Sequence, residues 1–440
     1  RADDFGKIRT LTVDINELSN QYAQAIVQDY ECVYCGSITS KPQDIMTDQE
    51  VEPASCSNSD CSKRNFEKAD SDDIDGQSAI VQDLPEASLN PSDIEIRLFD
   101  EYVNEFEAGD RITITVEVQT YEDSNTSRKY PRLKVLHADL EEEKAEIELT
   151  DEDIEKFENI VDNLDLLKKS YASHLEGSEI DTARESMLLS LFSGDYGNDC
   201  RDTVHTLMVG DPSTGKSDLI EEAKKVAPHF AFSTGLNASR AGISAGLEKS
   251  QKLQNEEWTL KAGTMVKGND GVALIDELDK MNESAVKSLY DPLARQKVKI
   301  DKIVSKELKA NPATAVASNP KNERWDLNKS IGEQIEFPPA LLSRFDLVWT
   351  VRDTNKSDES KAEAITSKYT SSSEDEDETL SNEEIRKYIY YAQNNYNPTL
   401  SAEAEEFLSQ KWKTMRNNID AVKGITIDTR QLESLITIAM

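Results

Sequence analysis

Eight residues, GDPSTGKS at 210–217, have the types and spacing of a phosphate-binding loop. The apolar run TLMV at 206–209 predicts a buried strand before the loop, and DLIEEAKKVA at 218–227 predicts an amphipathic helix after it. In that setting, glycines let backbone N–H groups surround a phosphate at the positive end of the helix. A chance glycine turn is the alternative, which the flanking elements disfavour. The predicted nucleotide contacts are Gly210, Asp211, Pro212, Ser213, Thr214, Gly215, Lys216 and Ser217.

Two of these side chains and a later acidic pair predict magnesium-assisted hydrolysis. Lys216 would reach the β- and γ-phosphates, and the Ser217 hydroxyl would hold Mg²⁺. The run VALIDE at 272–277 predicts a strand that ends in two carboxylates. Asp276 would bind Mg²⁺ through water, and Glu277 would orient and polarise the attacking water. An acidic pair is common at strand ends, but after a phosphate loop it indicates hydrolysis.

Two further polar residues extend this pattern. Asn319 follows the apolar run at 313–318 and could contact the γ-phosphate and the lytic water, although a simple strand-end turn explains Asn-Pro equally well. Arg344 stands in PPALLSRFD at 338–346 and could stabilise transition-state charge in a neighbouring subunit. A surface salt bridge is the alternative for Arg344. The order of the four elements along the chain favours the catalytic interpretation.

Four of the five cysteines predict a metal site. Two closely spaced pairs can each present two thiolates from a tight turn, and together they complete a tetrahedral Zn²⁺ shell. Four sulfur ligands with no open position indicate a structural site; buried or redox-active thiols are the alternative. Cys200 stands apart and is interpreted as an ordinary, partly buried thiol. The predicted zinc ligands are Cys32, Cys35, Cys56 and Cys61.

A β-rich first part and an α/β second part would position these groups. Alternating runs at 93–98 and 111–118, with a turn at 107–110, predict a small barrel or sandwich, of which the OB barrel is the usual nucleic-acid variant. TDED at 150–153 predicts a capping-box helix start, and later helices alternate with buried strands. We therefore predict an OB-type β-barrel domain at 1–140 with a zinc subdomain at about 28–66, a linker at 141–167, an α/β P-loop ATPase core at 168–370, and an acidic loop with a helical lid at 371–440.

Composition sets broad limits on the class of protein. The chain has 440 residues, of which 31% are charged, and a formal net charge of −35. No run is long and apolar enough to span a membrane, so no membrane partner is expected, and the clustered cysteines favour a reducing compartment. Acidity argues naively against nucleic acid as a partner, but much of it lies in solvated runs; a salt-loving host would also produce it. The absence of an initial Met suggests a fragment.

The ATPase motifs resemble those of the minichromosome maintenance (MCM) proteins, ring-shaped helicases of the AAA+ class. The loop is similar to the family's, although Ser213 and Gly215 depart from its usual residues, and ALIDELDKMNE at 273–283 resembles its Walker B signature with Leu278 in place of Phe. LLSRFDLVW at 341–349 resembles the family's arginine finger. ITIDTRQLESLI, from residue 425, resembles its second sensor helix, which implies that Arg430 contacts ATP across a subunit interface.

The resemblance extends, more weakly, over the amino-terminal part. KIRTLT, the cysteine cluster and the segment from residue 77 to 112 follow the order of the family's zinc and OB regions. The usual helical bundle before Arg1 and the winged helix after Met440 are not in the sequence. This resemblance implies an AAA+ domain with a helical lid, and ATP, Mg²⁺ and Zn²⁺ as cofactors.

Two basic hairpins are the candidate DNA contacts. The segment at 297–306 alternates charged and apolar residues and resembles the family's pre-sensor hairpin, which implies that Lys302 at its tip, with Lys299, enters the ring channel. Arg128 and Lys129 form a basic island in the barrel region. Contacts of this kind go to phosphates and carry little sequence information. An exposed hairpin with solvated lysines is the alternative for both.

The resemblance implies an ATP-dependent replicative helicase that moves 3′ to 5′ on one strand as a homo-oligomeric ring, a hexamer. Its implied partners are single-stranded and forked DNA and other replication proteins. Its implied location is the cytoplasm of an archaeon, at the nucleoid, or the nucleus of a eukaryote. Two rivals remain: another AAA+ machine such as a protein remodeller or clamp loader, and a ring subunit that binds DNA without hydrolysis.

Overall fold

The chain forms two compact units, and each is described by itself. The computed structural model describes residues 4–46, 50–61, 63–85, 92–122, 129–141, 147–161, 164–175, 178–194, 201–250, 258–301, 305–353, 379–417 and 429–440. The first unit contains residues 1–142 and, from much later in the chain, 247–261; the second contains 143–246 and 262–440. Among the described residues, no helix has the length and apolar character needed to cross a bilayer.

The first unit is built on a closed β-barrel. Strands β1, β6, β7, β5 and β4 pair in that order, and β4 also pairs with β1, so these strands close a ring as in an OB fold. Strand β11, which is paired with β10, also pairs with β1 on the edge opposite β4: Leu18 of β1 lies between Leu260 of β11 and Ala79 of β4. The elements are β1 (Ile8–Ser19), β2 (Tyr22–Cys32), β3 (Ile38–Pro42), β4 (Phe66–Gln82), β5 (Asp93–Phe99), η2 (Asp100–Tyr102), β6 (Arg111–Glu122), β7 (Lys129–Leu140), β10 (Ala245–Lys249) and β11 (Trp258–Ala262).

Strand alternation explains the barrel interior. Every second residue of β6 from Ile112 to Val118 is buried, as period-two patterning requires for strands with one face in the core. The strands predicted at 93–98 and 111–118 are confirmed as β5 and β6. In the predicted turn, Gly109 has a φ of 103°, a left-handed conformation that glycine adopts without strain. The amide of Glu107 donates to Asp110 Oδ2 at 2.7 Å and closes the turn.

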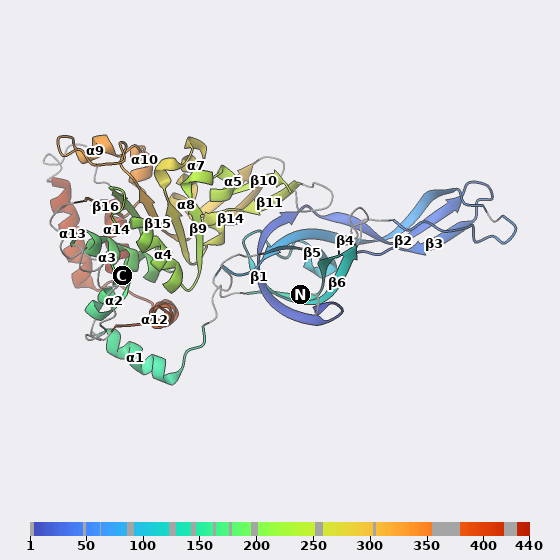
Figure 1. Ribbon diagram of the computed structural model, residues 1–440, viewed down its shortest axis with the longest axis horizontal. Coiled ribbons are helices and arrows are strands. Elements are labelled where there is room, and N and C mark those ends of the chain that lie inside the picture. Colours follow the sequence, from blue (N-terminus) through green and yellow to red (C-terminus); the bar gives the residue numbers. More distant parts are fainter. Residues whose placement is uncertain are drawn as a thin grey trace, which may run out of the picture. The chain divides into compact units, whose positions relative to one another are not determined.

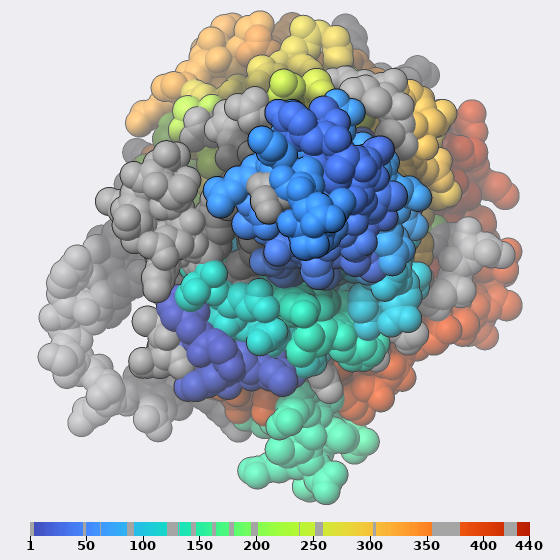
Figure 2. Space-filling model, turned by 90° about the vertical axis from the view of Figure 1, so that its right-hand side faces the viewer, coloured from blue at the N-terminus to red at the C-terminus, as the bar shows by residue number. Residues whose placement is uncertain are grey.

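A long arm extends from the barrel. It consists of β2, β3 and the first half of β4, which pair antiparallel (Figure 1). The arm carries the cysteine cluster, whose Cys32 is the last residue of β2. Figure 2 looks onto this arm end-on, where the blue residues of the first strands form the nearest surface. The Tyr30 ring is buried in the arm and makes an edge-to-face contact with Phe66, with ring centroids 6.4 Å apart. This aromatic pair packs directly beside the residue Cys32.

The second unit contains a parallel five-stranded sheet in the order β16-β8-β15-β12-β9. All residues of β8 and β15 are buried, as expected for central strands that are covered on both faces. The predicted parallel α/β sheet is therefore confirmed. The strands are β8 (His205–Gly210), β9 (Phe230–Thr234), β12 (Val272–Asp276), β15 (Ala313–Ser318) and β16 (Leu347–Val351), with the separate hairpin β13 (Lys297–Asp301) and β14 (Ser305–Lys309).

Helices cover this sheet and form its core with it. The capping box predicted at 150–153 is confirmed, because Thr150 N donates to Asp153 Oδ2 and Asp153 N to Thr150 Oγ1. The helix that it begins lies in the segment expected as a linker, but Phe157 is fully buried against Tyr388 of the lid, so this helix belongs to the second unit's core. Residues 354–378, which include most of the expected acidic loop, lie outside the described residues.

The helices of the second unit are labelled in Figure 1 where there is room. They are α1 (Asp151–Val161), α2 (Leu164–Ser170), α3 (Ser178–Phe192), α4 (Lys216–Val226), η3 (Gly235–Asn237), α5 (Arg240–Ile243), α6 (Thr264–Lys267), η4 (Leu278–Lys280), α7 (Glu283–Ser288), α8 (Tyr290–Arg295), α9 (Ile331–Gln334), α10 (Pro339–Leu342), α12 (Asn382–Asn395), α13 (Ala402–Asn417) and α14 (Thr429–Ala439).

Candidate nucleotide and metal sites

The phosphate loop joins β8 to α4 and is held in shape by its backbone. Ser213 and Gly215 have φ values of 61° and 87°, so the loop turns through the left-handed region twice. Gly215 adopts this conformation without strain, whereas Ser213 is strained there. A Cβ at Gly210 would lie 2.5 Å from Val351 O, so only glycine permits this close approach to β16. The loop conformation thus follows from the positions of its glycines.

Asp211 anchors the loop to the neighbouring segments. Its Oδ1 accepts from Trp325 N at 2.7 Å, and its Oδ2 accepts from Asp353 N at 2.9 Å. Gly210 and Asp211 offer the pocket no side chain, but their carbonyl oxygens accept from Lys216. The Asp211 side chain thus fixes the loop to the segments that contain Trp325 and Asp353.

Lys216 is the buried cation of the site. Its Nζ donates to Gly210 O at 2.9 Å, to Asp211 O at 2.6 Å and to Thr214 Oγ1 at 3.3 Å. Burial lowers the pKa of Lys216 to about 8, against the opposing effect of the Asp276 and Asp211 charges. An ammonium group that is desolvated in this way gains the most from an anionic ligand. The geometry therefore suits phosphate.

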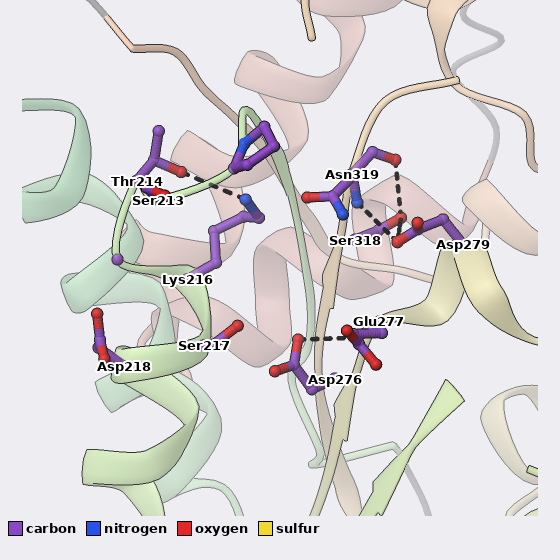
Figure 3. Close-up of a pocket in the computed structure, with 12 residues that line it drawn as sticks. Ser213, Thr214, Lys216, Ser217, Asp218, Asp276, Glu277, Asp279, Ser318 and Asn319 are labelled. Carbon is purple, nitrogen blue, oxygen red and sulfur yellow. Dashed lines mark hydrogen bonds between the residues drawn. The ribbon is translucent and has the colours of Figure 1, made fainter. Parts of the chain in front are cut away.

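A pocket of about 200 Å³ opens in front of the loop. It lies at the carboxyl ends of the parallel strands, where ligands bind in open α/β sheets. Figure 3 shows Ser217 facing Asp276 across the pocket, with Asn319 on a separate strand end. The pocket is lined by Pro212, Ser213, Thr214, Gly215, Lys216, Ser217, Asp218, Asp276, Glu277, Asp279, Ser318 and Asn319.

Glu277 is oriented by a residue that the sequence analysis missed. Its φ of 57° is left-handed, and its backbone N donates to Asp276 Oδ1 at 2.8 Å. Thr234 ends the neighbouring strand β9 and donates from Oγ1 to Glu277 Oε2 at 2.9 Å. A Cβ at Gly235 would lie 1.9 Å from Glu277 O, so that position accepts only glycine. The polar end of the apolar run FAFST was the available signal for Thr234.

Asn319 is held by a second missed residue, Asp279. Asp279 Oδ1 accepts from Asn319 N at 2.9 Å and from Ser318 Oγ at 3.4 Å. Asp279 Oδ2 is 3.2 Å from Lys280 Nζ. The Asp279 carboxylate therefore holds the end of β15 close to the acidic pair at the end of β12. A second carboxylate two residues after Glu277 was the only sequence signal for it.

Arg344 and Arg430 lie apart from this pocket: neither is among the described residues that line it. Arg344 Nε donates to Tyr290 O at 3.1 Å, and its guanidinium lies over the Tyr290 ring at 4.9 Å. Arg430 Nη2 donates to Leu293 O at 2.7 Å and to Arg344 O at 3.4 Å. The two arginines predicted to act together are thus neighbours, and both side chains donate to backbone carbonyls of α8.

The four clustered cysteines have the geometry of a zinc site. Their Sγ atoms all lie within 4.8 Å of one another. Cys32 Sγ is 3.7 Å from Cys61 Sγ, and Cys35 Sγ is 3.5 Å from Cys56 Sγ. A tetrahedral shell with Zn–S bonds of about 2.3 Å places its sulfurs about 3.8 Å apart. Hydrogen bonding to Ser37 lowers the pKa of the Cys35 thiol to about 6, whereas the pKa of Cys56 is raised despite a backbone hydrogen bond from Asn58, because desolvation and the neighbouring thiols disfavour a second thiolate. These residues fit Zn²⁺.

We expect the purified, reduced protein to contain about one Zn²⁺ per chain. Elemental analysis checks this, and Cys200→Ser is the matched control because Cys200 lies far from the other four cysteines in the sequence. Cys35→Ser should lose the metal, since three thiolates leave the tetrahedral shell open. Chelation should damage the first unit before it affects ATP binding, because the two sites lie in different units. Zinc-free reduced protein with an intact arm would contradict the assignment.

The predicted DNA-contacting residues are only partly described. Strands β13 and β14 form the expected hairpin, with Asp301 opposite Ser305, and Lys299 is exposed on it. Lys302 and Arg128 lie outside the described residues, as does Cys200. Lys129 is the first residue of β7.

Comparison with known proteins covers most of the chain. Residues 1–122 match the MCM OB domain, residues 150–371 the MCM P-loop domain, and residues 383–440 the MCM AAA-lid domain.

Individual relatives give the same result. DNA replication licensing factor mcm4 of Schizosaccharomyces pombe is 28% identical over 93% of this chain and 50% of the relative. Minichromosome maintenance protein MCM of Saccharolobus solfataricus is 30% identical over 83% and 55%. DNA replication licensing factor Mcm2 of Drosophila melanogaster is 27% identical over 98% and 52%. The chain thus spans about half the length of the curated relatives it matches.

A parallel sheet with β15 between β8 and β12, a phosphate loop after β8 and a helical lid define a P-loop domain of the AAA+ class. An OB domain precedes it, with a four-cysteine arm. The chain belongs to the minichromosome maintenance family of DNA replication proteins. Its OB, P-loop and lid domains confirm the fold predicted from the sequence.

Proposed function

We propose that this chain is the motor part of an ATP-dependent replicative DNA helicase. The observation that carries the proposal is that Lys216, Glu277 and Asn319 line the same pocket. The chain that contains this pocket also has an OB domain. The relatives' names concern DNA replication licensing and minichromosome maintenance, which supports a role at replicating DNA. The proposed location is accordingly the nucleoid or the nucleus.

The pocket residues divide the work of hydrolysis among themselves. Ser217 and Asp276 are the residues that would hold Mg²⁺, which neutralises charge on the phosphates. Lys216 binds the β- and γ-phosphates of ATP. Glu277, held by Thr234, orients the attacking water and takes its proton, while Asn319 contacts the γ-phosphate side.

The remaining residues act between subunits. Arg344 and Arg430 stabilise transition-state charge on the ATP of a neighbouring subunit, so an active site is complete only in an oligomer. The oligomer is a homo-hexameric ring that encircles one DNA strand and moves 3′ to 5′. Other replication proteins join it at the fork.

DNA contact is local and compatible with an acidic chain. Lys299 and Lys302 on the β13–β14 hairpin, with Arg128 and Lys129 of the first unit, contact strand phosphates. In a ring only the channel-facing residues meet the DNA, so six copies of a lysine make a positive collar while the outer surface stays acidic.

Forked DNA tests this proposal against its two rivals. We expect ATPase activity to rise when forked DNA is added, and unwinding to require a 3′ tail. A protein remodeller or clamp loader would not unwind the fork, and a hydrolysis-inactive ring subunit would bind DNA without turnover. The control is the same duplex with a 5′ tail alone, which should remain duplex. Unwinding that needs only the 5′ tail would overturn the direction.

A further inference from the structure

Asp346, two residues after Arg344, is fixed beside the start of β8. Its backbone N donates to His205 O at 2.8 Å, and its Oδ2 accepts from His205 N at 2.8 Å. Two hydrogen bonds to one residue leave Asp346 little freedom to turn. Burial lowers the pKa of His205 to about 3, so the His205 ring is neutral and does not balance the Asp346 charge.

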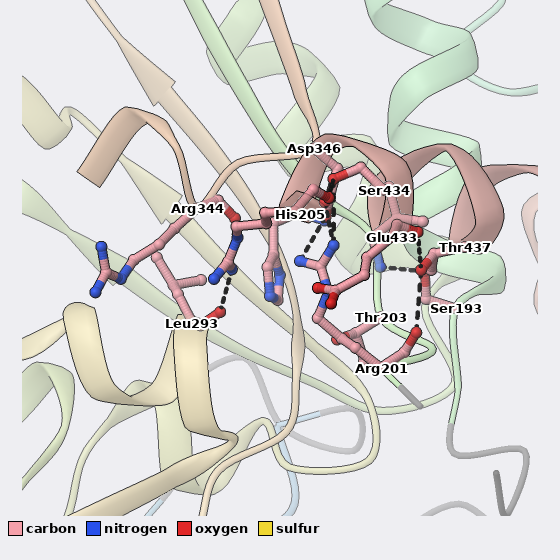
Figure 4. Close-up of polar contacts among 12 residues, drawn as sticks. Ser193, Arg201, Thr203, His205, Leu293, Arg344, Asp346, Glu433, Ser434 and Thr437 are labelled. Carbon is pink, nitrogen blue, oxygen red and sulfur yellow. Dashed lines mark hydrogen bonds and ion pairs between the residues drawn. The ribbon is translucent and has the colours of Figure 1, made fainter. Parts of the chain in front are cut away.

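The Asp346 carboxylate joins three separate parts of the second unit. Its side chain is completely shielded from solvent and is paired with Arg201, whose Nη1 donates to Oδ2 at 3.1 Å. Arg201 Nη2 and Ser434 Oγ both donate to Oδ1. Figure 4 shows these groups converging on Asp346. The carboxylate therefore ties α14, which carries Ser434, to the β8 and β16 strand ends.

Ser434 connects this carboxylate to the predicted sensor arginine. In α14 its Oγ also lies 3.0 Å from Arg430 O, one helical turn earlier. The Arg430 guanidinium in turn donates to Arg344 O at 3.4 Å. Ser434 thus lies next to both the Asp346 carboxylate and the Arg430 backbone, and the Arg430 guanidinium donates to the backbone of Arg344, two residues before Asp346 in the chain. Any tilt of α14 would change the distance between the two arginines.

The two arginine side chains both bind backbone carbonyls of the short helix α8. Arg344 contacts Tyr290 and Arg430 contacts Leu293, one turn apart on α8. In Figure 4 the Arg344 guanidinium points away from the Asp346 cluster. A buried ion pair that only docks the lid onto the core is the alternative, since such pairs are common and contribute little net stability. The contacts favour positioning, because they join the Asp346 carboxylate through Ser434 to the backbone of Arg430, whose guanidinium binds the backbone of Arg344.

We propose that Asp346, acting through Ser434, is a positioning residue that sets the spacing of Arg344 and Arg430 for a neighbouring subunit's ATP. This inference rests on the proposed function. It adds that the lid and the arginine finger of one chain are held as a single unit, so that both cations reach the same phosphates together.

Ser434→Ala tests the proposal in the full chain. It removes one hydroxyl from α14 and leaves the Arg201–Asp346 pair in place. We expect kcat for ATP hydrolysis to fall about tenfold, the order of one hydrogen bond to a charged group, with KM for ATP nearly unchanged. The matched control is Thr437→Val, because Thr437 Oγ1 ties the same helix to Arg201 O at 3.0 Å without touching Asp346. The control should keep its kcat. Equal losses in both variants would show that only lid docking matters.

Mixed oligomers separate positioning across subunits from damage within one subunit. Lys216→Ala subunits lack a working phosphate loop but keep their arginines, so mixing them with Ser434→Ala subunits should restore hydrolysis at the Ser434→Ala pockets. Normal turnover in the pure Ser434→Ala protein, or a loss that mixing does not restore, overturns the proposal.

Arg344→Ala subunits identify which hypothesis has failed. If Arg344→Ala is rescued by Lys216→Ala subunits and Ser434→Ala is not, the arginines act across subunits but Ser434 does not position them. If Arg344→Ala is not rescued either, the cross-subunit role in the proposed function is wrong, and the positioning proposal is overturned with it.

Discussion

ATP turnover should fall by a factor of about a hundred to ten thousand in Glu277→Gln, while ATP still binds. The amide cannot accept the proton of the attacking water, so general-base assistance is lost. Lys216 and Ser217 remain in place, because Glu277 makes no contact with either in the described structure. Turnover and nucleotide affinity measured on the same preparation check both halves of this expectation.

Two further variants sharpen the test. Glu283→Gln is the matched control, because Glu283 is an exposed carboxylate on α7 whose partner is Lys287. It should keep normal turnover. Thr234→Val should show an intermediate loss, since it keeps the Glu277 carboxylate but removes the hydroxyl that orients it. Wild-type turnover in Glu277→Gln would remove Glu277 from the mechanism.

Local sequence signals predicted the elements whose geometry is itself local. The phosphate loop depends on glycine at 215 and on the strand and helix that flank it, all within one short segment. Likewise, each cysteine pair spans a single turn, so Cys32 and Cys35 predict their own proximity. Periodicity gave β5 and β6 for the same reason.

Long-range arrangement could not be obtained in this way. Thr234 reaches Glu277 only because β9 and β12 are parallel neighbours, with Thr234 opposite Asp276. The segment 247–261 joins the first unit although 104 residues of the second unit, 143–246, precede it in the chain. Neither the pairing of β9 with β12 nor the place of 247–261 in the first unit can be recognised from the local sequence. The Arg344–Arg430 contact likewise depends on how α14 packs against α8.

Unwinding should disappear in Lys302→Ala while basal ATP hydrolysis survives. Lys302 follows Asp301, the last paired residue of β13, and the pocket lining among the described residues includes nothing from this hairpin. Removing the lysine deletes one phosphate contact per subunit from the element proposed to move the DNA. Weaker DNA affinity with a shallower salt dependence should accompany the loss, because fewer counterions are released on binding.

The matched control and mixed rings make this prediction decisive. Lys309→Ala removes the same charge from the base of the hairpin, where Lys309 lies opposite Lys297, and should still unwind forked DNA. If hydrolysis moves the hairpins in turn around a ring, each added Lys302→Ala subunit interrupts the path of the strand. Unwinding should then fall more steeply than ATPase activity as the mutant fraction rises. A fully substituted ring that unwinds at the normal rate would mean that Lys302 is a solvated surface lysine and that the strand is held elsewhere.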